Sequence, residues 1–163
     1  MKVITRALVA GCAVAAAVWS LGGLHREAPA MAAVAGESPG YAVEDFSYPG
    51  ADKVLAERGI VLKRGDGHIM LAECSGDPAM LEVWSRLFKK TFCFKVTGDT
   101  GYLELEIPQV FTIKGNDYST KVEMTSGDER KTFDIEKGNW TSVGEITDPE
   151  NREFALVEIR TSK

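Results

Sequence analysis

The amino-acid sequence predicts a mainly β protein: an antiparallel β-sandwich with one short N-terminal helix and a disulfide. Short segments of alternating apolar and polar residues recur at intervals of about 8 to 12 residues, and clusters of Gly, Asn and Asp separate them. No pattern of strands alternating with long helices is present, so a parallel sheet is not expected. Two cysteines in a chain with an export signal predict the disulfide.

Residues 1–35 are predicted to be a signal peptide. A basic beginning is followed by an apolar run over residues 7–24 and then by small residues in the pattern that signal peptidase accepts. One alternative is a retained membrane anchor, because this run is just long enough to span a bilayer. Another is lipidation at Cys12, although most of the apolar run would then follow the cysteine. The possible cleavage sites follow Ala30, Ala32 and Ala35.

The predicted export places the protein outside the cell. The net charge is -5, and no run of Lys or Arg is longer than two residues. Nucleic acid is therefore not an expected partner, because binding phosphates requires clustered cations. Once the leader is removed, no stable membrane anchor is expected.

Residues 36–47 are predicted to be a flexible N-terminal extension, and residues 48–163 a single β-sandwich-like domain. The extension has no sustained period, but Tyr41, Val43 and Phe46 near its end are apolar or aromatic. Such side chains either cover the edge of the core or dock into a partner as an added strand or strap.

The helix is expected over Ala51 to Arg58. Val54 and Leu55 are assigned to its buried face, and Gly59 provides the left-handed residue that ends it. A helix of two turns depends on tertiary packing for its stability.

After Gly59 the period changes to two, which predicts strands. The first two, residues 60–62 and 68–72, flank Arg64-Gly65-Asp66-Gly67, and the Asp-Gly pair predicts a β-hairpin there. In the strand 102–107, Glu104 and Glu106 are expected to face outward. The other strands are expected at residues 81–86, 91–96, 110–113, 118–124, 131–135 and 154–159.

Cys74 and Cys93 lie 19 positions apart and are predicted to form a disulfide. Closing a ring of this size stabilises the fold by roughly 3 kcal/mol in the loop-entropy model. Metal binding is the alternative, but two thiols and His68 are too few for a closed zinc site.

No catalytic residue, metal site or cofactor is predicted. His68 could act as a general base, but no nucleophile motif accompanies it. Glu104 and Glu106 could form a glycosidase pair, but outward carboxylates on a strand are typical of a solvated sheet face. Arg64-Gly65-Asp66 matches an adhesion triplet, which a turn explains equally well. The same preference explains the turn residues that could bind calcium weakly: Asp99, Asn116, Asp117 and Asp128.

Trp140 is the main candidate among the aromatic residues. It stands in a polar segment, Gly138 to Thr141, where an exposed Trp could anchor a protein or a sugar. The alternative is that it folds back over the end of the sandwich. Trp84 alternates with Leu81 and Val83, and one of these two faces is expected to be core.

Three blocks of sequence carry a resemblance to a known group: VEDFSYPGADKVLAERGIVLKRGDGHIMLAEC, FCFKVTGDTGYLELEIP and VEIRTSK. Over residues 43–163 the chain resembles small secreted β-rich proteins of filamentous actinobacteria, including the bridging subunit of umbrella toxin particles. The resemblance implies a non-enzymatic adaptor that links a large toxin-bearing stalk protein to a trypsin-like lectin subunit. It also implies that residues 33–46 insert into the cleft of the trypsin-like domain.

The predicted function is therefore that of a secreted, non-enzymatic adaptor in an extracellular complex. The expected partner contacts are Tyr41, Val43, Glu44, Phe46 and Trp140.

Two alternatives remain. One is a protease inhibitor that presents Arg86, Lys89 or Lys90 in the loop Ser75 to Phe92, and the other is a carbohydrate-binding module that uses Trp140.

Overall fold

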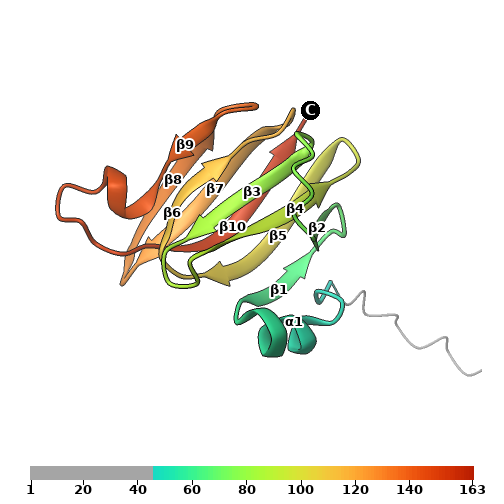
Figure 1. Cartoon of the computed structure of the whole chain (residues 1–163), viewed down its shortest axis with the longest axis horizontal. Helices are drawn as coiled ribbons and strands as arrows, with labels where there is room; N and C mark the ends of the chain where they lie inside the picture. The colour runs from blue at the N-terminus through green and yellow to red at the C-terminus, as the bar shows by residue number, and fades with distance from the viewer. Residues whose placement is uncertain (1–45) are drawn as a thin grey trace, which may run out of the picture. The chain divides into compact units, whose positions relative to one another are not determined.

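The computed structural model describes residues 46–163 as two five-stranded antiparallel sheets that face each other (Figure 1). Sheet A has the order β1 (Val61–Gly65), β5 (Thr100–Ile107), β10 (Ala155–Ser162), β7 (Ser119–Ser126) and β8 (Glu129–Ile135). Sheet B has the order β2 (Ile69–Ala72), β4 (Lys90–Val96), β3 (Met80–Ser85), β6 (Val110–Lys114) and β9 (Trp140–Ser142). The helix α1 (Ala51–Arg58) and the short 3-10 helix η1 (Gly144–Thr147) complete the fold. The expected β-sandwich is confirmed.

The hydrophobic core lies between the two sheets. In β5, Leu103 and Leu105 are fully buried, whereas Glu104 and Glu106 point to the opposite face, as the alternation predicts. Phe92 supplies one of the largest buried side chains from β4 of the other sheet. Burying a side chain of this size stabilises the fold by roughly 1.5–3 kcal/mol. Among the described residues, no helix has the length and apolar character needed to cross a membrane.

The predicted disulfide is present. Cys74 and Cys93 are joined, with their Cα atoms 5.2 Å apart. Cys74 follows β2, and Cys93 lies in β4 opposite Ala72, the last residue of β2. The bond therefore secures the pairing of β2, which is the edge strand of sheet B, to its neighbour.

The helix α1 has the expected bounds. Gly59 ends it in the left-handed conformation, with φ 76°, and its N–H donates to the carbonyl oxygen of Leu55 over 2.9 Å. Val54 packs against the core, but Leu55 is 48% exposed, so its assignment to the buried face is wrong. Successive residues on a helix point about 100° apart, and a two-turn helix that contacts the core along one stripe leaves Leu55 outside it.

The expected hairpin around Arg64-Gly65-Asp66-Gly67 is also wrong. β1 belongs to sheet A and pairs with β5, whereas β2 belongs to sheet B and pairs with β4, so the chain changes sheets here. Gly65 stays in β1, where an added Cβ would lie 2.6 Å from the carbonyl oxygen of Tyr102. The turn follows at Asp66, whose carboxylate accepts a hydrogen bond from the N–H of His68 at 3.0 Å.

Residues 46–48 lie along the free edge of β1. The N–H of Gly65 donates to the carbonyl oxygen of Phe46 over 2.9 Å, and the N–H of Tyr48 donates to that of Lys63 over 2.9 Å. The side chain of Tyr48 is buried, and its hydroxyl accepts a hydrogen bond from the N–H of Leu71 in β2 at 2.8 Å. Tyr48 therefore joins the edges of the two sheets.

β9 is absent from the strands expected from the sequence. Trp140, expected in a turn, is the first residue of this three-residue strand and pairs with Lys114 of β6. Most other strands begin or end within two residues of their expected positions. The exceptions are β1 and β10, which extend to Gly65 and Ser162, each three residues past its expected end.

Candidate functional site

Three aromatic side chains meet on the outer face of sheet B. Trp84 in β3 points outward because its neighbours Val83 and Ser85 are buried. Its ring centroid lies 5.9 Å from that of Trp140 and 6.4 Å from that of Phe111, and both contacts are edge-to-face. We refer to Trp84, Phe111 and Trp140 as the aromatic surface.

A β-bulge brings Phe111 into this group. Trp84 is opposite Thr112 of β6, and Ser85 is opposite Val110, so Phe111 is an extra residue without a partner in β3. The extra residue shifts the alternation of β6, which lets Phe111 lie beside Trp84 while Val110 stays buried. Bulges are commonly used to redirect a side chain in this way.

The two tryptophans are exposed to an unusual degree for their size. Trp84 is 39% exposed and Trp140 is 48% exposed. Each lies on a hydrogen-bonded strand, so its backbone is fixed. Exposed aromatic side chains that are held together on rigid elements are typical of binding surfaces.

Two cations border the aromatic surface. The guanidinium of Arg86 lies 4.6 Å from the ring centroid of Phe111, and its Nε is 3.1 Å from a carboxylate oxygen of Glu145 in η1. The Nζ of Lys114 lies 5.9 Å from the ring centroid of Trp140 and 3.1 Å from a carboxylate oxygen of Glu82. These contacts restrain the rings in their present orientation.

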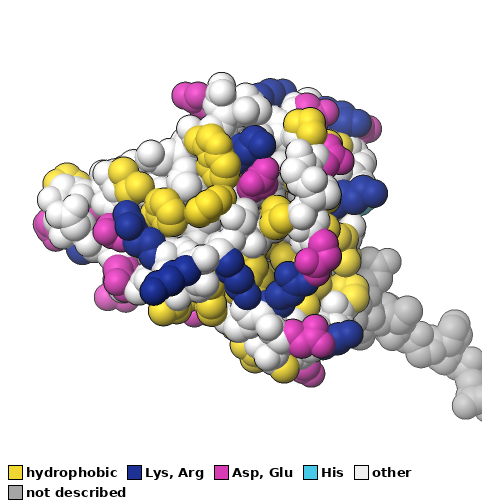
Figure 2. Space-filling view, viewed as in Figure 1, with side chains coloured by type: hydrophobic (Ala, Val, Ile, Leu, Met, Phe, Trp, Pro, Cys, Tyr) yellow, Lys and Arg dark blue, Asp and Glu magenta, His cyan; other side chains and the backbone are white. Residues whose placement is uncertain are grey.

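A shallow hollow of about 430 Å³ opens beside Trp84 and Phe111. Its other lining residues are Ser85, Arg86 and Lys89, and none of the described residues that line it is acidic. Figure 2 shows this face, where hydrophobic side chains gather over β3 and β6 and Lys and Arg side chains form a row beside them.

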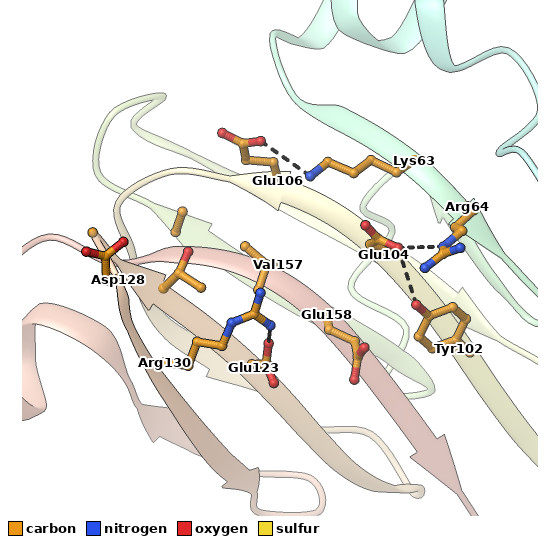
Figure 3. Close-up of a pocket in the computed structure, with 13 residues that line it drawn as sticks. Lys63, Arg64, Tyr102, Glu104, Glu106, Glu123, Asp128, Arg130, Val157 and Glu158 are labelled. Carbon is orange, nitrogen blue, oxygen red and sulfur yellow. Dashed lines mark hydrogen bonds and ion pairs between the residues drawn. The ribbon is translucent and has the colours of Figure 1, made fainter.

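The outer face of sheet A carries a second surface, an open groove of about 630 Å³ lined mostly by charged side chains (Figure 3). Arg64 of β1 donates to a carboxylate oxygen of Glu104 at 2.6 Å. Lys63 lies 3.7 Å from a carboxylate oxygen of Glu106, and Arg130 pairs with Glu123. The carboxylates of these cross-strand pairs are thus already neutralised by cations of the same sheet.

This electrostatic environment opposes acid catalysis by Glu104. The hydrogen bond from Arg64 lowers the pKa of Glu104 below its ordinary value. A glycosidase general acid needs the opposite, a raised pKa that keeps the carboxyl group protonated near neutral pH. Glu104 and Glu106 do share the outer face of β5, as the sequence predicts, but Arg64 keeps the carboxylate of Glu104 charged.

The ring of His68 is held in place by contacts with the loop before β5 and with β5. Its ring Nδ1 lies 2.7 Å from the carbonyl oxygen of Thr100, and the ring sits close to Gly98. Arg64 of the adhesion triplet is in β1 and is paired with Glu104. Within residues 46–163, no group of His, Cys, Asp and Glu side chains is arranged to hold a metal ion.

Of the five expected partner contacts, the described residues include Phe46 and Trp140, and these two lie apart. Tyr41, Val43 and Glu44 lie outside the described residues. Phe46 is 56% exposed beside β1, at one edge of sheet A, whereas Trp140 is in β9 at the far edge of sheet B. Figure 1 shows β1 and β9 on opposite sides of the sandwich.

The expected loop Ser75 to Phe92 is not one continuous loop, because β3 and the first residues of β4 lie within it. It contains β3 and a tight turn in which the N–H of Lys89 donates to the carbonyl oxygen of Arg86 at 3.2 Å. Arg86 is engaged with Phe111 and Glu145, and Lys89 is exposed. This turn lacks the extended backbone that a protease cleft accepts as an added strand.

Trp140 was expected to be a binding residue, whereas its two aromatic neighbours were not. The outward direction of Trp84 could have been read from its alternation with Leu81 and Val83. Phe111 carried no such signal, because only the bulge places it on the outer face.

Comparison with known proteins adds no family to this description. No protein-family model matches the chain, and no curated protein matches it.

Proposed function

We propose that this protein is a secreted, non-enzymatic binding protein that acts as an adaptor in an extracellular protein complex. The observation that carries the proposal is the aromatic surface: two exposed tryptophans and a half-buried phenylalanine in contact on adjacent strands, with Arg86 at their border. Tryptophan and arginine are enriched among the residues that dominate the energetics of protein interfaces.

The geometry of the rings favours a protein over a sugar as the ligand. Sugars stack on the open face of an aromatic ring, whereas these rings contact one another edge-to-face. Arg86 and Lys114 also lie over Phe111 and Trp140, so one face of each of these rings is occupied. A carbohydrate-binding module remains the second candidate, supported by the exposure of Trp84 and Trp140 on one sheet face.

An adaptor needs two contact surfaces, and the described sandwich offers two of different chemistry. The aromatic surface is on the outer face of sheet B, and the ion-paired groove is on the outer face of sheet A. Binding at the groove would depend strongly on ionic strength, because its exposed charges are screened by salt. Binding at the aromatic surface would be less sensitive to salt.

The proposals that the protein is secreted and that it has two partners rest on observations other than the aromatic surface. The apolar leader and the Cys74–Cys93 disulfide support export into an oxidising environment. The resemblance to bridging subunits suggests two partners, a trypsin-like lectin subunit and a large stalk protein. In that arrangement residues 33–46 would contact the first, and the aromatic surface would be free for the second.

Affinity purification of the tagged protein from its native culture fluid tests the proposal. The wild-type chain should recover partner proteins in stoichiometric amount, and the double variant Trp84→Ala, Trp140→Ala should lose at least one of them. Leu55→Ala is the matched control, since Leu55 is as exposed as Trp140 but lies on α1.

Two other outcomes of this purification would argue against a protein contact at the aromatic surface. Full recovery of every partner by the double variant would contradict the proposed surface. Recovery of a polysaccharide in place of a protein, lost on Trp140→Ala, would favour the carbohydrate-binding function.

A further inference from the structure

We infer that the hollow beside the aromatic surface binds an acidic side chain of the partner protein, in a segment where that residue neighbours an aromatic or aliphatic one. This inference rests on the proposed function and specifies the chemistry of the partner. It rests on four observations: the lining of the hollow, the ion pairing of its two cations, the backbone and position of Lys89, and the net charge of the chain.

The hollow combines an apolar wall with a cationic rim. Trp84 and Phe111 provide the wall, and Arg86 and Lys89 provide the charges. An apolar side chain can pack on the rings, while a carboxylate next to it in sequence reaches the cations. A neutral or basic segment would leave Lys89 without a partner in the desolvated contact.

The two cations differ in how far they are already neutralised. Arg86 has a partner in Glu145 at 3.1 Å. Lys89 forms no ion pair with any other described residue, and its side chain is exposed. Lys89 is therefore the residue that can gain most from an incoming carboxylate.

The backbone at Lys89 is unusual for a lysine. Its φ is 50°, in the left-handed region that favours glycine, and its N–H closes the turn onto the carbonyl oxygen of Arg86. A turn of this kind accepts Gly or Asn readily, so the lysine is not explained by local conformation. Its place at the rim of the hollow gives it a role.

The local charge also opposes the charge of the whole chain. The protein carries a net charge of -5, yet both charged residues that line the hollow, Arg86 and Lys89, are cations. The attraction for an acidic segment is thus short-ranged and confined to this face. It therefore selects the orientation in which the partner binds more than it raises the rate of association.

The test is a selection of random peptides displayed on phage against the full chain carrying Trp19→Phe. Trp19 is the one other tryptophan of the chain and lies in the predicted leader; replacing it ensures that tryptophan emission reports on Trp84 and Trp140 alone even where the leader is retained. The selected peptides should contain Asp or Glu next to an aromatic or aliphatic residue, and should shift this emission when synthesised and titrated.

Variants of Lys89 test the charge directly. Lys89→Glu should weaken the selected peptides by roughly tenfold or more, whereas Lys89→Arg should retain their affinity. Lys95→Glu is the matched control, because Lys95 is exposed on the same sheet face and forms no ion pair with another described residue. It should change the affinity by less than about twofold.

The outcomes distinguish a failure of the acidic-ligand inference from a failure of the proposed aromatic surface. The inference would be overturned if neutral or basic peptides shifted the emission, or if Lys89→Glu left the affinity of acidic peptides unchanged. Either result would still leave the aromatic surface as a binding site. Peptides that bind equally well after Trp84→Ala and Trp140→Ala would overturn the surface itself. A selection that enriches no sequence would also overturn the inference.

Discussion

Asp148 is the most strongly held ionisable side chain of the described sandwich. Its buried carboxylate accepts hydrogen bonds from Nη2 of Arg152 at 2.7 Å and from Nζ of Lys131 at 2.7 Å, as well as from the backbone N–H of Arg152 at 3.0 Å. These donors hold the pKa of Asp148 well below its usual range. A single residue thus fixes the segment after η1 to β8.

The pH dependence of stability follows from this shift. The carboxyl group binds a proton more tightly in the unfolded chain, where its pKa is about 3.9, than in the folded protein. The contribution of Asp148 is therefore fully present above that value and is lost as the pH falls below it. We expect the urea midpoint of the wild-type chain to drop steeply below about pH 4.

Asp148→Asn should lower the urea midpoint at neutral pH, because it leaves Arg152 and Lys131 near a neutral group. It should also flatten the decline of stability in acid. Asp134→Asn is the control, since Asp134 pairs with Lys121 on the exposed surface. If Asp148→Asn and Asp134→Asn had the same urea midpoint at every pH, Asp148 would not be the source of the acid sensitivity.

At the scale of elements, α1 is held against the sandwich at its C-terminal end. Gly59 adopts a left-handed conformation, and an added Cβ would lie 2.8 Å from Cε1 of Phe88. Gly50, just before the helix, is also left-handed with φ 69°, but an added Cβ there would meet nothing within 4 Å. The two glycines differ in their surroundings but not in their conformational requirement.

This contrast predicts the effect of two alanine substitutions. Gly50→Ala should cost about 1 kcal/mol of unfolding free energy, from the left-handed backbone alone. Gly59→Ala should cost more, because Phe88 must also move. Urea denaturation of both variants measures the two losses of unfolding free energy. Equal losses would show that the Phe88 side chain moves at little cost and that α1 packs only loosely.

At the scale of the whole molecule, local patterns predict the strands better than they predict their partners. The alternation in Leu103, Glu104 and Leu105 is enough to place β5 and its two faces. The pairing of β1 with β5 depends on contacts some forty residues apart in sequence, so the Asp66-Gly67 signal suggested a hairpin that does not form. Short elements such as β9 are fixed by their neighbours and leave little trace in the sequence.

The candidate site follows the same rule. Trp140 stands out by its polar surroundings, and Trp84 by its alternation with buried residues. Phe111 joins them only because β6 has one residue more than β3 at the bulge. A surface assembled from three strands is set by register, which single-strand patterns do not report.

We propose above all that the aromatic surface is the contact for a protein partner. Its most direct test is iodide quenching of tryptophan fluorescence in the Trp19→Phe chain, alone and saturated with the partner recovered from culture fluid. The complex is formed with a fragment of this partner that lacks tryptophan, so Trp84 and Trp140 are the only tryptophans in both samples. Iodide should quench their emission in the free protein, and the partner should protect it from quenching in the complex. Equal quenching in the two states, with the complex fully formed, would place the contact elsewhere and contradict the account.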